Sequence, residues 1–251
     1  MTTQTTSRTG RILDALGGED HHARLALATA ERHHITALLP GDEHWPTALE
    51  DLGADAPAML WAHGDTSLLA RSLTQRIAIT GARACTAYGE HVATDLAAAL
   101  SGAGHVLVTG GAYGIDATVH RAVRPGGAPG IAVLASGIDR LYPTGNTDLL
   151  QDVAATGLLL SEAPPGAVPT RQRFVQRGRI IAALCGATVI VEAAYRSGAL
   201  TVAHRALALR RIVAAVPGPV TSAASAGCHQ LIQNGETHLI THAGDLTALI
   251  T

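Results

Sequence analysis

The only Phe of the chain lies inside its densest cluster of arginines. Phe174 occurs in the segment RQRFVQRGR, with Arg171 and Arg173 before it and Arg177 and Arg179 after it. Guanidinium groups bind phosphates, and an exposed ring stacks on an unpaired base for about 1–3 kcal/mol. These residues favour a site for single-stranded nucleic acid, because a duplex hides the faces of its bases. A second interpretation puts Phe174 in the core and leaves the arginines on a solvated loop.

Two further segments place glycines directly after apolar runs. TGARACTAYG contains Gly81 and Arg83, and TGGAYGID contains Gly110, Gly111 and Gly114. Backbone N–H groups at such turns, and at the start of the helix that follows, bind phosphate, and Arg83 is placed to meet an anion. A tight turn that simply needs glycine explains either motif equally well on its own.

A third turn and two carboxylates complete the set of candidate site residues. In RSGALT, Ser197 and Gly198 precede a predicted helix, where Ser197 has the simpler role of a helix N-cap. Glu162 and Glu192 each end an apolar run, in LLLSE and VIVEA. They are open to three interpretations: an acid–base pair, groups that orient nearby arginines, or ligands of ribose hydroxyls. Because no nucleophile is fixed beside them, we predict no catalytic residue.

Histidines and cysteines give no metal-ligand pattern. The two HH pairs, at 21–22 and 33–34, lie in a predicted helix on which adjacent side chains point in different directions, so we expect them at the surface. Cys85, Cys185 and Cys228 are odd in number and far apart, which is typical of a reducing cytosol. We therefore expect neither a metal nor a cofactor.

Composition places these residues in a globular α/β protein. The hydrophobic fraction is 47% and the aromatic fraction only 3%, so the core must consist of Ala, Val, Leu and Ile. The formal net charge is −2 and the chain has no Lys, so any anion site must be a local cluster of arginines. No apolar run is long enough for a signal peptide or a membrane span, and we expect a soluble cytoplasmic protein.

The order of elements determines where the candidate residues meet. From Arg76 onward, short apolar runs alternate with helical patterns, which indicates an extended Rossmann-like, doubly wound and mostly parallel sheet with helices on both faces. Ligands bind at the carboxyl ends of the strands of such sheets, where the turns described above lie. We expect residues 1–10 to be disordered, residues 21–34 to be helical, and the next segment to be irregular and packed on the sheet.

A series of motifs follows in order along the chain: GDEHWPTAL, ITGARACTAYG, TGGAYGIDATVHRA, IAVLASGIDRLYPTGN, LLLSEAPPG, FVQRGRIIAAL, VIVEAAYRSGALTVAHRAL and VPGPVTSAASAGCHQLIQNG. In this order they resemble the DprA/Smf family of DNA-processing proteins, over roughly residues 36–245. The resemblance implies an extended Rossmann domain over 36–251 that binds single-stranded DNA without sequence preference. It also implies homodimers, and loading of the RecA recombinase onto that DNA in recombination and natural transformation. Residues 1–35 would then be a reduced N-terminal region, and no C-terminal winged helix is expected.

The resemblance also assigns a DNA-binding pocket. Its residues here are Gly81, Arg83, Gly110, Gly111, Gly114, Arg171, Phe174, Arg177 and Arg179, to which we add Ser197 and Gly198. Two departures from the family pattern concern this pocket. Arg177-Gly178-Arg179 replaces the usual Arg-Asn-Arg, which we expect to loosen the start of a helix, and Thr109-Gly110-Gly111 replaces a turn that usually begins Ser-Gly.

Two other functions fit parts of the pattern. One is an enzyme like the Rossmann-like nucleoside-monophosphate phosphoribohydrolases, supported by Glu162, Glu192 and the glycine turns. Their PGGxGTxxE signature is missing, since this chain reads EAAYRSGALT after the corresponding strand. The other is a sensor that binds a free nucleotide and signals through a partner.

Overall fold

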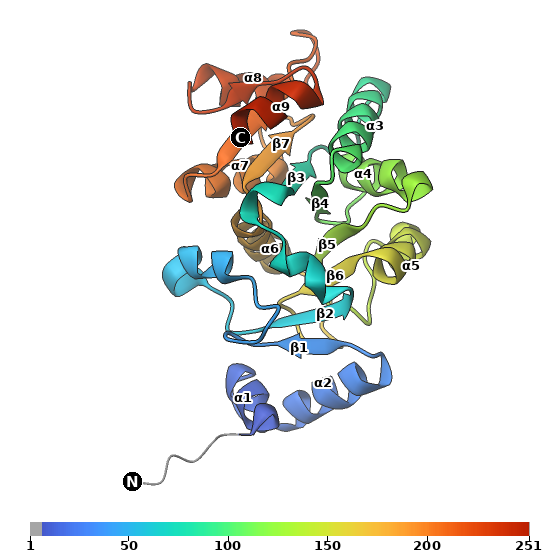
Figure 1. The fold of residues 1–251 in the computed structure, drawn as a ribbon, viewed down its shortest axis with the longest axis vertical. Helices are drawn as coiled ribbons and strands as arrows, with labels where there is room; N and C mark the ends of the chain where they lie inside the picture. Colours follow the sequence, from blue (N-terminus) through green and yellow to red (C-terminus); the bar gives the residue numbers. More distant parts are fainter. Residues whose placement is uncertain (1–6, 251) are drawn as a thin grey trace.

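A mixed sheet forms the centre of the computed structural model, which describes residues 7–250 (Figure 1). Its nine strands are β1 (Thr36–Leu38), β2 (Leu60–Gly64), β3 (Arg76–Thr80), β4 (Val106–Thr109), β5 (Gly130–Leu134), β6 (Leu158–Ser161), β7 (Ala187–Ile190), β8 (Ile212–Ala215) and β9 (His238–Leu239). Their spatial order is β1-β2-β6-β5-β4-β3-β7-β8-β9. Strands β6, β5, β4, β3, β7, β8 and β9 all run parallel to one another. Strand β2 is antiparallel to both β6 and β1.

The direction of winding reverses at β3. The chain builds β4, β5 and β6 on one side of β3, then crosses over and adds β7, β8 and β9 on the other. In the register, Ile77 of β3 pairs with Leu107 of β4 and with Ala187 of β7. The loops after β3 and β7 therefore diverge at a topological switch point, which is where doubly wound sheets open a ligand crevice.

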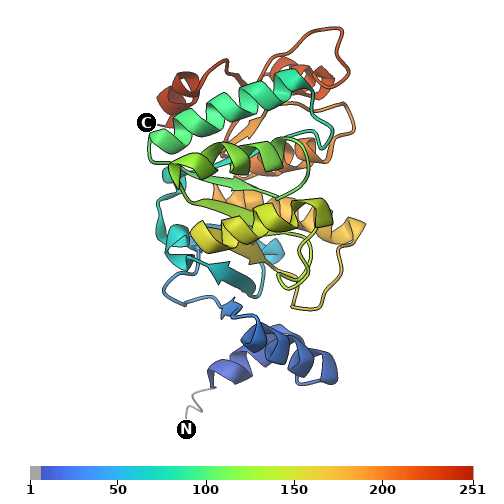
Figure 2. The ribbon, with the colours of Figure 1, turned by 90° about the vertical axis from the view of Figure 1, so that its right-hand side faces the viewer.

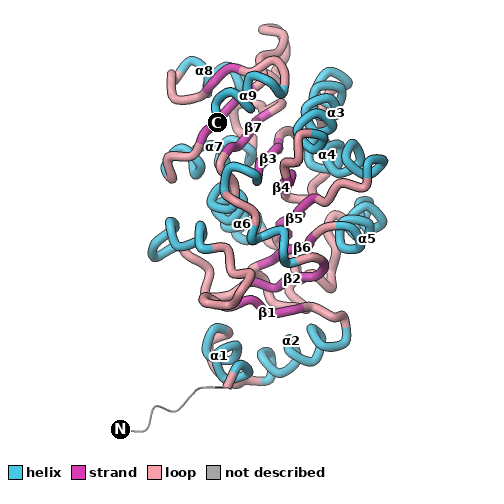
Figure 3. The backbone as a smooth tube through the Cα atoms, in the orientation of Figure 1, coloured by secondary structure: helices cyan, strands magenta, loops and turns pink. Residues whose placement is uncertain are grey.

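Helices cover both faces of the sheet, as Figures 2 and 3 show. One face carries α3 (Ala87–Gly102), α4 (Ile115–Val123) and α5 (Thr147–Thr156), which lie side by side in Figure 2, together with α9 (Ala243–Ile250). The other carries α6 (Arg171–Leu184), α7 (Gly198–Ala208) and α8 (Ala226–Gln233). Short 3-10 helices are η1 (Thr47–Asp55), η2 (Thr66–Ala70), η3 (Leu73–Gln75), η4 (Arg124–Gly126) and η5 (Thr144–Asn146). The prediction of a mostly parallel, doubly wound sheet is confirmed.

The core explains why the strands read as continuous apolar runs. In β3, Ile77 and Ile79 pack against α3 and α4, whereas Ala78 between them packs toward α6 and α7. Both faces of the strand are thus buried, and alternation with polar residues is lost. The small Ala78 leaves room for the close approach of the helices on its side.

The N-terminal region differs from expectation in two ways. Residues 1–6 of the segment expected to be disordered lie outside the described residues, but α1 (Arg8–Ala15) begins directly after Ser7, whose hydroxyl accepts a hydrogen bond from the Gly10 N–H. The expectation was therefore wrong for residues 8–10. The segment expected to be irregular contains β1 and β2, which extend the sheet.

The helix predicted at 21–34 is α2 (His21–Arg32), which packs with α1 beside β1. Ile12 of α1 and Ala30 of α2 join a buried cluster with Trp61 and Leu150. The His pairs at 21–22 and 33–34 are exposed, as expected. No helix among residues 7–250 combines the length and apolar character of a membrane span. In the same range, His, Cys, Asp and Glu side chains do not gather in threes around a possible metal position.

Candidate nucleic-acid interface

Two adjoining hollows open at the carboxyl edge of the sheet. The larger, of about 590 Å³, is called the wide groove here. It is lined by Thr80, Gly81, Arg83, Ala112, Asp116, Arg171, Phe174, Val175, Arg177, Gly178, Ser197, Gly198, Ala199, Thr201 and Val202. These residues come from the end of β3, from the loops after β3, β4 and β7, and from α4, α6 and α7, so the groove lies at the switch point. Its volume is within the range of ligand sites.

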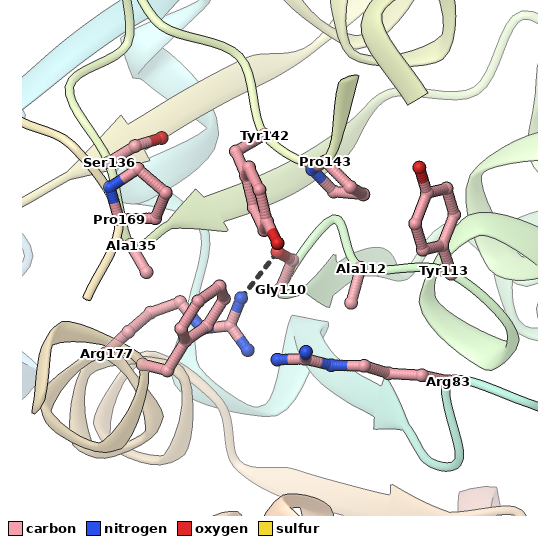
Figure 4. A pocket seen from close by; sticks show the side chains of 11 residues that line it. Arg83, Gly110, Ala112, Tyr113, Ala135, Ser136, Tyr142, Pro143, Pro169 and Arg177 are labelled. Carbon is pink, nitrogen blue, oxygen red and sulfur yellow. Dashed lines mark hydrogen bonds between the residues drawn. The ribbon is translucent and has the colours of Figure 1, made fainter. Parts of the chain in front are cut away.

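The smaller hollow, of about 130 Å³, is called the enclosed pocket (Figure 4). It is lined by Arg83, Gly110, Ala112, Tyr113, Ala135, Ser136, Tyr142, Pro143, Pro169, Phe174 and Arg177. Arg83, Ala112, Phe174 and Arg177 line both hollows and so form the partition between them. The site therefore consists of a groove and a side pocket that share one wall of cations and an aromatic ring.

The first two turns of α6 supply Phe174 and Arg177 of this wall, and Arg171 of the wide groove. Thr170 caps the helix by accepting a hydrogen bond from the Arg173 N–H at 3.2 Å. Residues three apart on a helix share a face, and Arg171, Phe174 and Arg177 all line the wide groove. The sequence prediction that Arg171 and Phe174 face the same way is confirmed.

The Phe174 ring is half-buried and surrounded by the groups that the sequence associated with it. The guanidinium carbon of Arg83 lies 4.7 Å from the ring centroid, and that of Arg177 lies 5.6 Å from it. The Tyr142 ring packs edge-on, with the centroids 5.8 Å apart and the planes at 61°. Of the two interpretations of Phe174, burial in the core does not describe this position.

Arg177 lies across the glycine turn after β4. Its Nη1 donates a hydrogen bond of 2.6 Å to the Gly110 carbonyl, and a Cβ on Gly110 would come within 2.4 Å of the guanidinium. Glycine is thus required for this close approach. Burial lowers the pKa of Arg177; Asp116 opposes that effect and the positive charge of Arg83 adds to it. Even so, the guanidinium stays charged at neutral pH, because its ordinary pKa lies far above 7.

The three cations of the site are not held in ion pairs within the described part of the chain, although Asp116 lies near enough to act on the charge of Arg177. None of Arg83, Arg171 and Arg177 forms an ion pair with any carboxylate of residues 7–250. Figure 4 shows Arg83 and Arg177 extending toward each other from opposite sides of the enclosed pocket, with Tyr142 across from them. The Nε of Arg177 is also buried without a hydrogen-bond partner. Two like charges held this close favour an anion between or beside them.

Asp116 is a central residue of the site that the sequence reasoning missed. Its carboxylate accepts hydrogen bonds from the Thr80 hydroxyl at 2.8 Å and from the N–H groups of Gly110 and Ala112 at 3.0 and 3.2 Å. It thereby ties the end of β3 to the turn after β4. The available signal was its position two residues after the last glycine of TGGAYGID, in the first turn of a helix.

Two of the predicted glycines shape the turns without lining either hollow. Gly114 has a φ of +72°, and a Cβ there would lie 2.2 Å from the Ala82 carbonyl oxygen. The next residue, Ile115, donates its N–H to that same carbonyl at 3.2 Å. Gly111, with a φ of +66°, packs against the side chain of Leu150. The structure thus places both beneath the site, where Gly114 lets the turn that carries Arg83 come close.

Arg179 lies apart from the other predicted site residues. Only 9% of it is exposed, and its guanidinium forms a bidentate pair with Glu162 at 2.9 and 2.7 Å. Its Nε also donates to the Asp55 carbonyl at 2.7 Å. It lines neither the wide groove nor the enclosed pocket. The structure gives it a link between α6, the end of β6 and η1.

Gly178 lies inside α6 and not at its start. The helix runs from Arg171 to Leu184, so the expectation that Gly178 loosens the helix start is wrong. A Cβ on Gly178 would meet Val202 of α7 at 3.4 Å, an ordinary packing distance. The glycine therefore lies where α6 and α7 pack together beneath the wide groove.

Glu192 and Ser197 serve local structure. Glu192 is buried and accepts hydrogen bonds from the Thr86 N–H at 2.9 Å and the Thr86 hydroxyl at 2.6 Å, at the start of α3. Of the interpretations left open for the two carboxylates, orientation of an arginine describes Glu162. Ser197 caps α7 by accepting from the Ala199 N–H at 3.3 Å, and with Gly198 it also lines the wide groove.

The walls of the enclosed pocket are the other part of the site that the sequence reasoning missed. Tyr113 and Tyr142, which follow β4 and β5, line the pocket with Ser136. The signal was present in the sequence. Both tyrosines follow apolar strands in a chain with few aromatic residues.

Comparison of the sequence with known proteins identifies the family to which this chain is similar. Residues 36–251 match the family model of DNA recombination-mediator protein A. A DprA relative from Mycobacterium tuberculosis is 47% identical over 223 residues, which are 85% of this chain but only 57% of that protein. The chain thus spans less than two thirds of the length of that relative.

Two solved structures have the same architecture. DNA processing protein A from Streptococcus pneumoniae superposes with a TM-score of 0.83 at 33% identity, covering 93% of this chain and 78% of that one. DNA processing protein A from Helicobacter pylori gives a TM-score of 0.77 at 29% identity, covering 86% of this chain and 95% of that one. The Helicobacter structure describes the single-stranded DNA binding mode of that protein.

Proposed function

Because the chain belongs to the family of DNA recombination-mediator protein A, we propose that it binds single-stranded DNA without sequence preference. The observation that carries the proposal is the convergence of Arg83, Arg171 and Arg177, none of them paired with a carboxylate of residues 7–250, around the half-buried ring of Phe174. The single-stranded DNA binding described for the Helicobacter relative supports it.

In this proposal the strand lies along the wide groove. Its phosphates pair with the three arginines, and an unstacked base contacts Phe174. These contacts reach the backbone and the flat faces of bases, which all four nucleotides share. Binding is therefore tolerant of sequence, and duplex DNA, whose bases are stacked on each other, binds more weakly.

The proposal extends to the cellular role. The protein acts in the cytoplasm as a homodimer and loads RecA onto the bound strand during recombination and DNA uptake. No chemical step is part of this function. The two carboxylates that an enzyme would use are engaged elsewhere, Glu162 with Arg179 and Glu192 with Thr86.

Binding is tested by fluorescence anisotropy with labelled oligo-dT, oligo-dA and a duplex of the same length. We expect similar affinity for the two single strands and weaker binding of the duplex. Arg83→Ala weakens binding to both single strands alike. Arg32→Ala, which removes an exposed cation at the end of α2, leaves it unchanged. Preference for the duplex, or equal binding by Arg83→Ala and the parent, contradicts the proposal.

The cellular role needs separate measurements. RecA ATPase activity on single strands coated with single-strand-binding protein should rise when the protein is added, and sedimentation should give the mass of a dimer. If the ATPase activity does not rise, RecA loading is no longer part of the proposal. If sedimentation gives the mass of a monomer, the homodimer is no longer part of it. Release of adenine from AMP would replace the proposal with the enzyme alternative.

A further inference from the structure

The most exposed aromatic ring of residues 7–250 lies at the margin of the wide groove. Among the Phe, Trp and Tyr side chains in that range, Tyr195 is the most exposed, at 68%. Tyr195 and the exposed Arg196 are in the loop between β7 and α7, directly before Ser197 and Gly198 of the groove lining. Neither Tyr195 nor Arg196 lines the groove or the enclosed pocket. The two side chains therefore lie next to the groove and outside it.

The loop that carries them has a fixed backbone. The Ser197 N–H donates to the carbonyl three residues earlier at 2.9 Å, which closes a turn with Tyr195 and Arg196 at its two central positions. From the other side, the N–H of Gly227 in the first turn of α8 donates to the Ala193 carbonyl at 2.7 Å. The turn is thus held by both α7 and α8, and a ligand that binds there has little backbone to order.

The side chains of Tyr195 and Arg196 have no partner in the fold. Within residues 7–250, neither forms a hydrogen bond, an ion pair, or a contact with an aromatic ring. The other tyrosines differ. The hydroxyl of Tyr88 donates to a backbone carbonyl at 2.5 Å, that of Tyr113 accepts a backbone N–H at 3.1 Å, and the Tyr142 ring packs edge-on against another ring. The exposed ring and guanidinium are therefore available to a ligand.

A polymer bound in the wide groove must continue past it. The volume of about 590 Å³ is that of a site for one drug-sized ligand, so a strand of more than a few nucleotides extends over the surfaces that border the groove. Each further nucleotide presents a flat base and a phosphate. An aromatic ring stacks on the first, and a guanidinium pairs with the second. Tyr195 and Arg196 offer both groups on one turn beside the groove.

We infer that the turn after β7 extends the single-strand site beyond the wide groove, with the Tyr195 ring stacked on one base and the Arg196 guanidinium paired with a phosphate next to it. This inference rests on the proposed function. The three arginines of the groove keep their phosphates, and the turn adds one aromatic and one ionic contact to them. The Tyr195 hydroxyl has no part in the contact, because stacking uses the face of the ring.

The test separates base contact from phosphate contact with two ligands. Anisotropy titrations use an oligo-dT long enough to pass the groove at both ends, and an abasic oligomer of the same length, which keeps the sugar–phosphate backbone. For Tyr195→Leu we expect affinity for oligo-dT to fall roughly 5-fold or more, in line with the loss of a stacked base. Its affinity for the abasic oligomer stays that of the parent. For Arg196→Ala we expect affinity for both oligomers to fall by the same factor.

Salt titrations give a second readout. Arg196→Ala should make the slope of log K against log salt concentration shallower by about 0.7, the contribution of one phosphate contact on a single strand. Tyr195→Leu keeps the slope of the parent, because it removes no charge. A purely structural role of the turn would not divide the two readouts between the two variants in this way.

Control variants make the result specific. Tyr195→Phe keeps the ring and should bind oligo-dT as the parent does. Leu25→Ala removes an exposed apolar side chain of α2, and Arg32→Ala removes an exposed cation of the same helix, and both should also bind as the parent does. Thermal unfolding of each variant shows whether the fold is retained.

The outcomes distinguish the turn from the groove. If Tyr195→Leu weakens binding of both oligomers equally or of neither, or if Arg196→Ala keeps the slope of the parent, the inference is overturned while binding in the groove stands. Failure of the parent to bind oligo-dT overturns the proposed function as well.

Discussion

At the scale of single residues, the position of Phe174 depends on its neighbours. Its ring has cations on its surface and a tyrosine edge beside it, so it is neither free in solvent nor part of the core. The sequence predicted this association because the residue types were unusual together. Tyr142 and Asp116 were missed because a position after an apolar strand was the only signal that either residue offered, and their contacts with the site required the structure.

Replacement of Phe174 measures how much its ring contributes to the affinity for single-stranded DNA. We expect Phe174→Leu to weaken oligo-dT binding roughly 5- to 150-fold, since a base–aromatic stack contributes about 1–3 kcal/mol. Phe174→Tyr keeps the ring and should bind within about twofold of the parent. Anisotropy at a fixed salt concentration measures both. If the leucine variant binds as tightly as the parent, Phe174 does not contact a base.

His120 is a buried histidine near the site, and its lowered pKa makes the stability of the folded protein depend on pH. It is 3% exposed in α4, and its Nε2 lies 2.8 Å from the Thr109 hydroxyl, which accepts the Gly111 N–H at 2.9 Å. Burial lowers the pKa of His120 to about 4 from its usual value of 6.5. The ring is therefore neutral in the folded protein, while the unfolded chain binds a proton more readily as the pH falls.

The stability that neutral His120 contributes is present above about pH 6.5 and lost as the pH falls toward 4. Between pH 7.5 and 4.5, we expect the parent to lose about 2–3 kcal/mol more unfolding free energy than His120→Gln does. Urea unfolding at the two pH values measures the difference, and groups shared by the two proteins cancel. Equal losses would show that His120 is not held neutral.

At the scale of elements, α6 explains which predicted contacts come together. Arg171, Phe174 and Arg177 are spaced by three residues and share one face, whereas Arg179 is two residues beyond Arg177 and projects to the other side. Helical spacing alone contains this distinction, so Arg179 could have been separated from the group.

The β3-to-β9 region was predictable because its apolar runs are continuous. The antiparallel strands β1 and β2 were not, since only 3-10 helices lie between β1 and β3 and no α-helical pattern alternates with these strands.

Replacement of Arg179 separates structure from binding. Arg179→Leu leaves Glu162 and the Asp55 carbonyl without their partner, and we expect the unfolding free energy to fall by about 1–3 kcal/mol. Affinity for oligo-dT, measured well below the melting temperature, should stay within about twofold of the parent. Because Glu162 is the charge left alone, Glu162→Gln in the same chain should recover part of the stability. Weaker DNA binding at unchanged stability would instead place Arg179 in the interface.

At the scale of the whole molecule, attraction for a polyanion is local. The chain has a formal net charge of −2, so long-range charge does not draw DNA to it. The glycine turns, the Asp116 hydrogen bonds and the start of α6 instead concentrate three guanidinium groups, none of them in an ion pair with a carboxylate of residues 7–250, at the switch point of the sheet. Sequence reasoning located this edge, because parallel strands end together. The division of the edge into a groove and a side pocket required the structure.

The central claim is that Arg83, Arg171 and Arg177 hold phosphates of a single strand, and the salt dependence of binding tests it most directly. Each phosphate contact on a single strand contributes about −0.7 to the slope of log K against log salt concentration. The variant with all three arginines replaced by Ala should have a slope shallower by about 2, while Arg32→Ala keeps the slope of the parent. An unchanged slope in the triple variant would contradict the account.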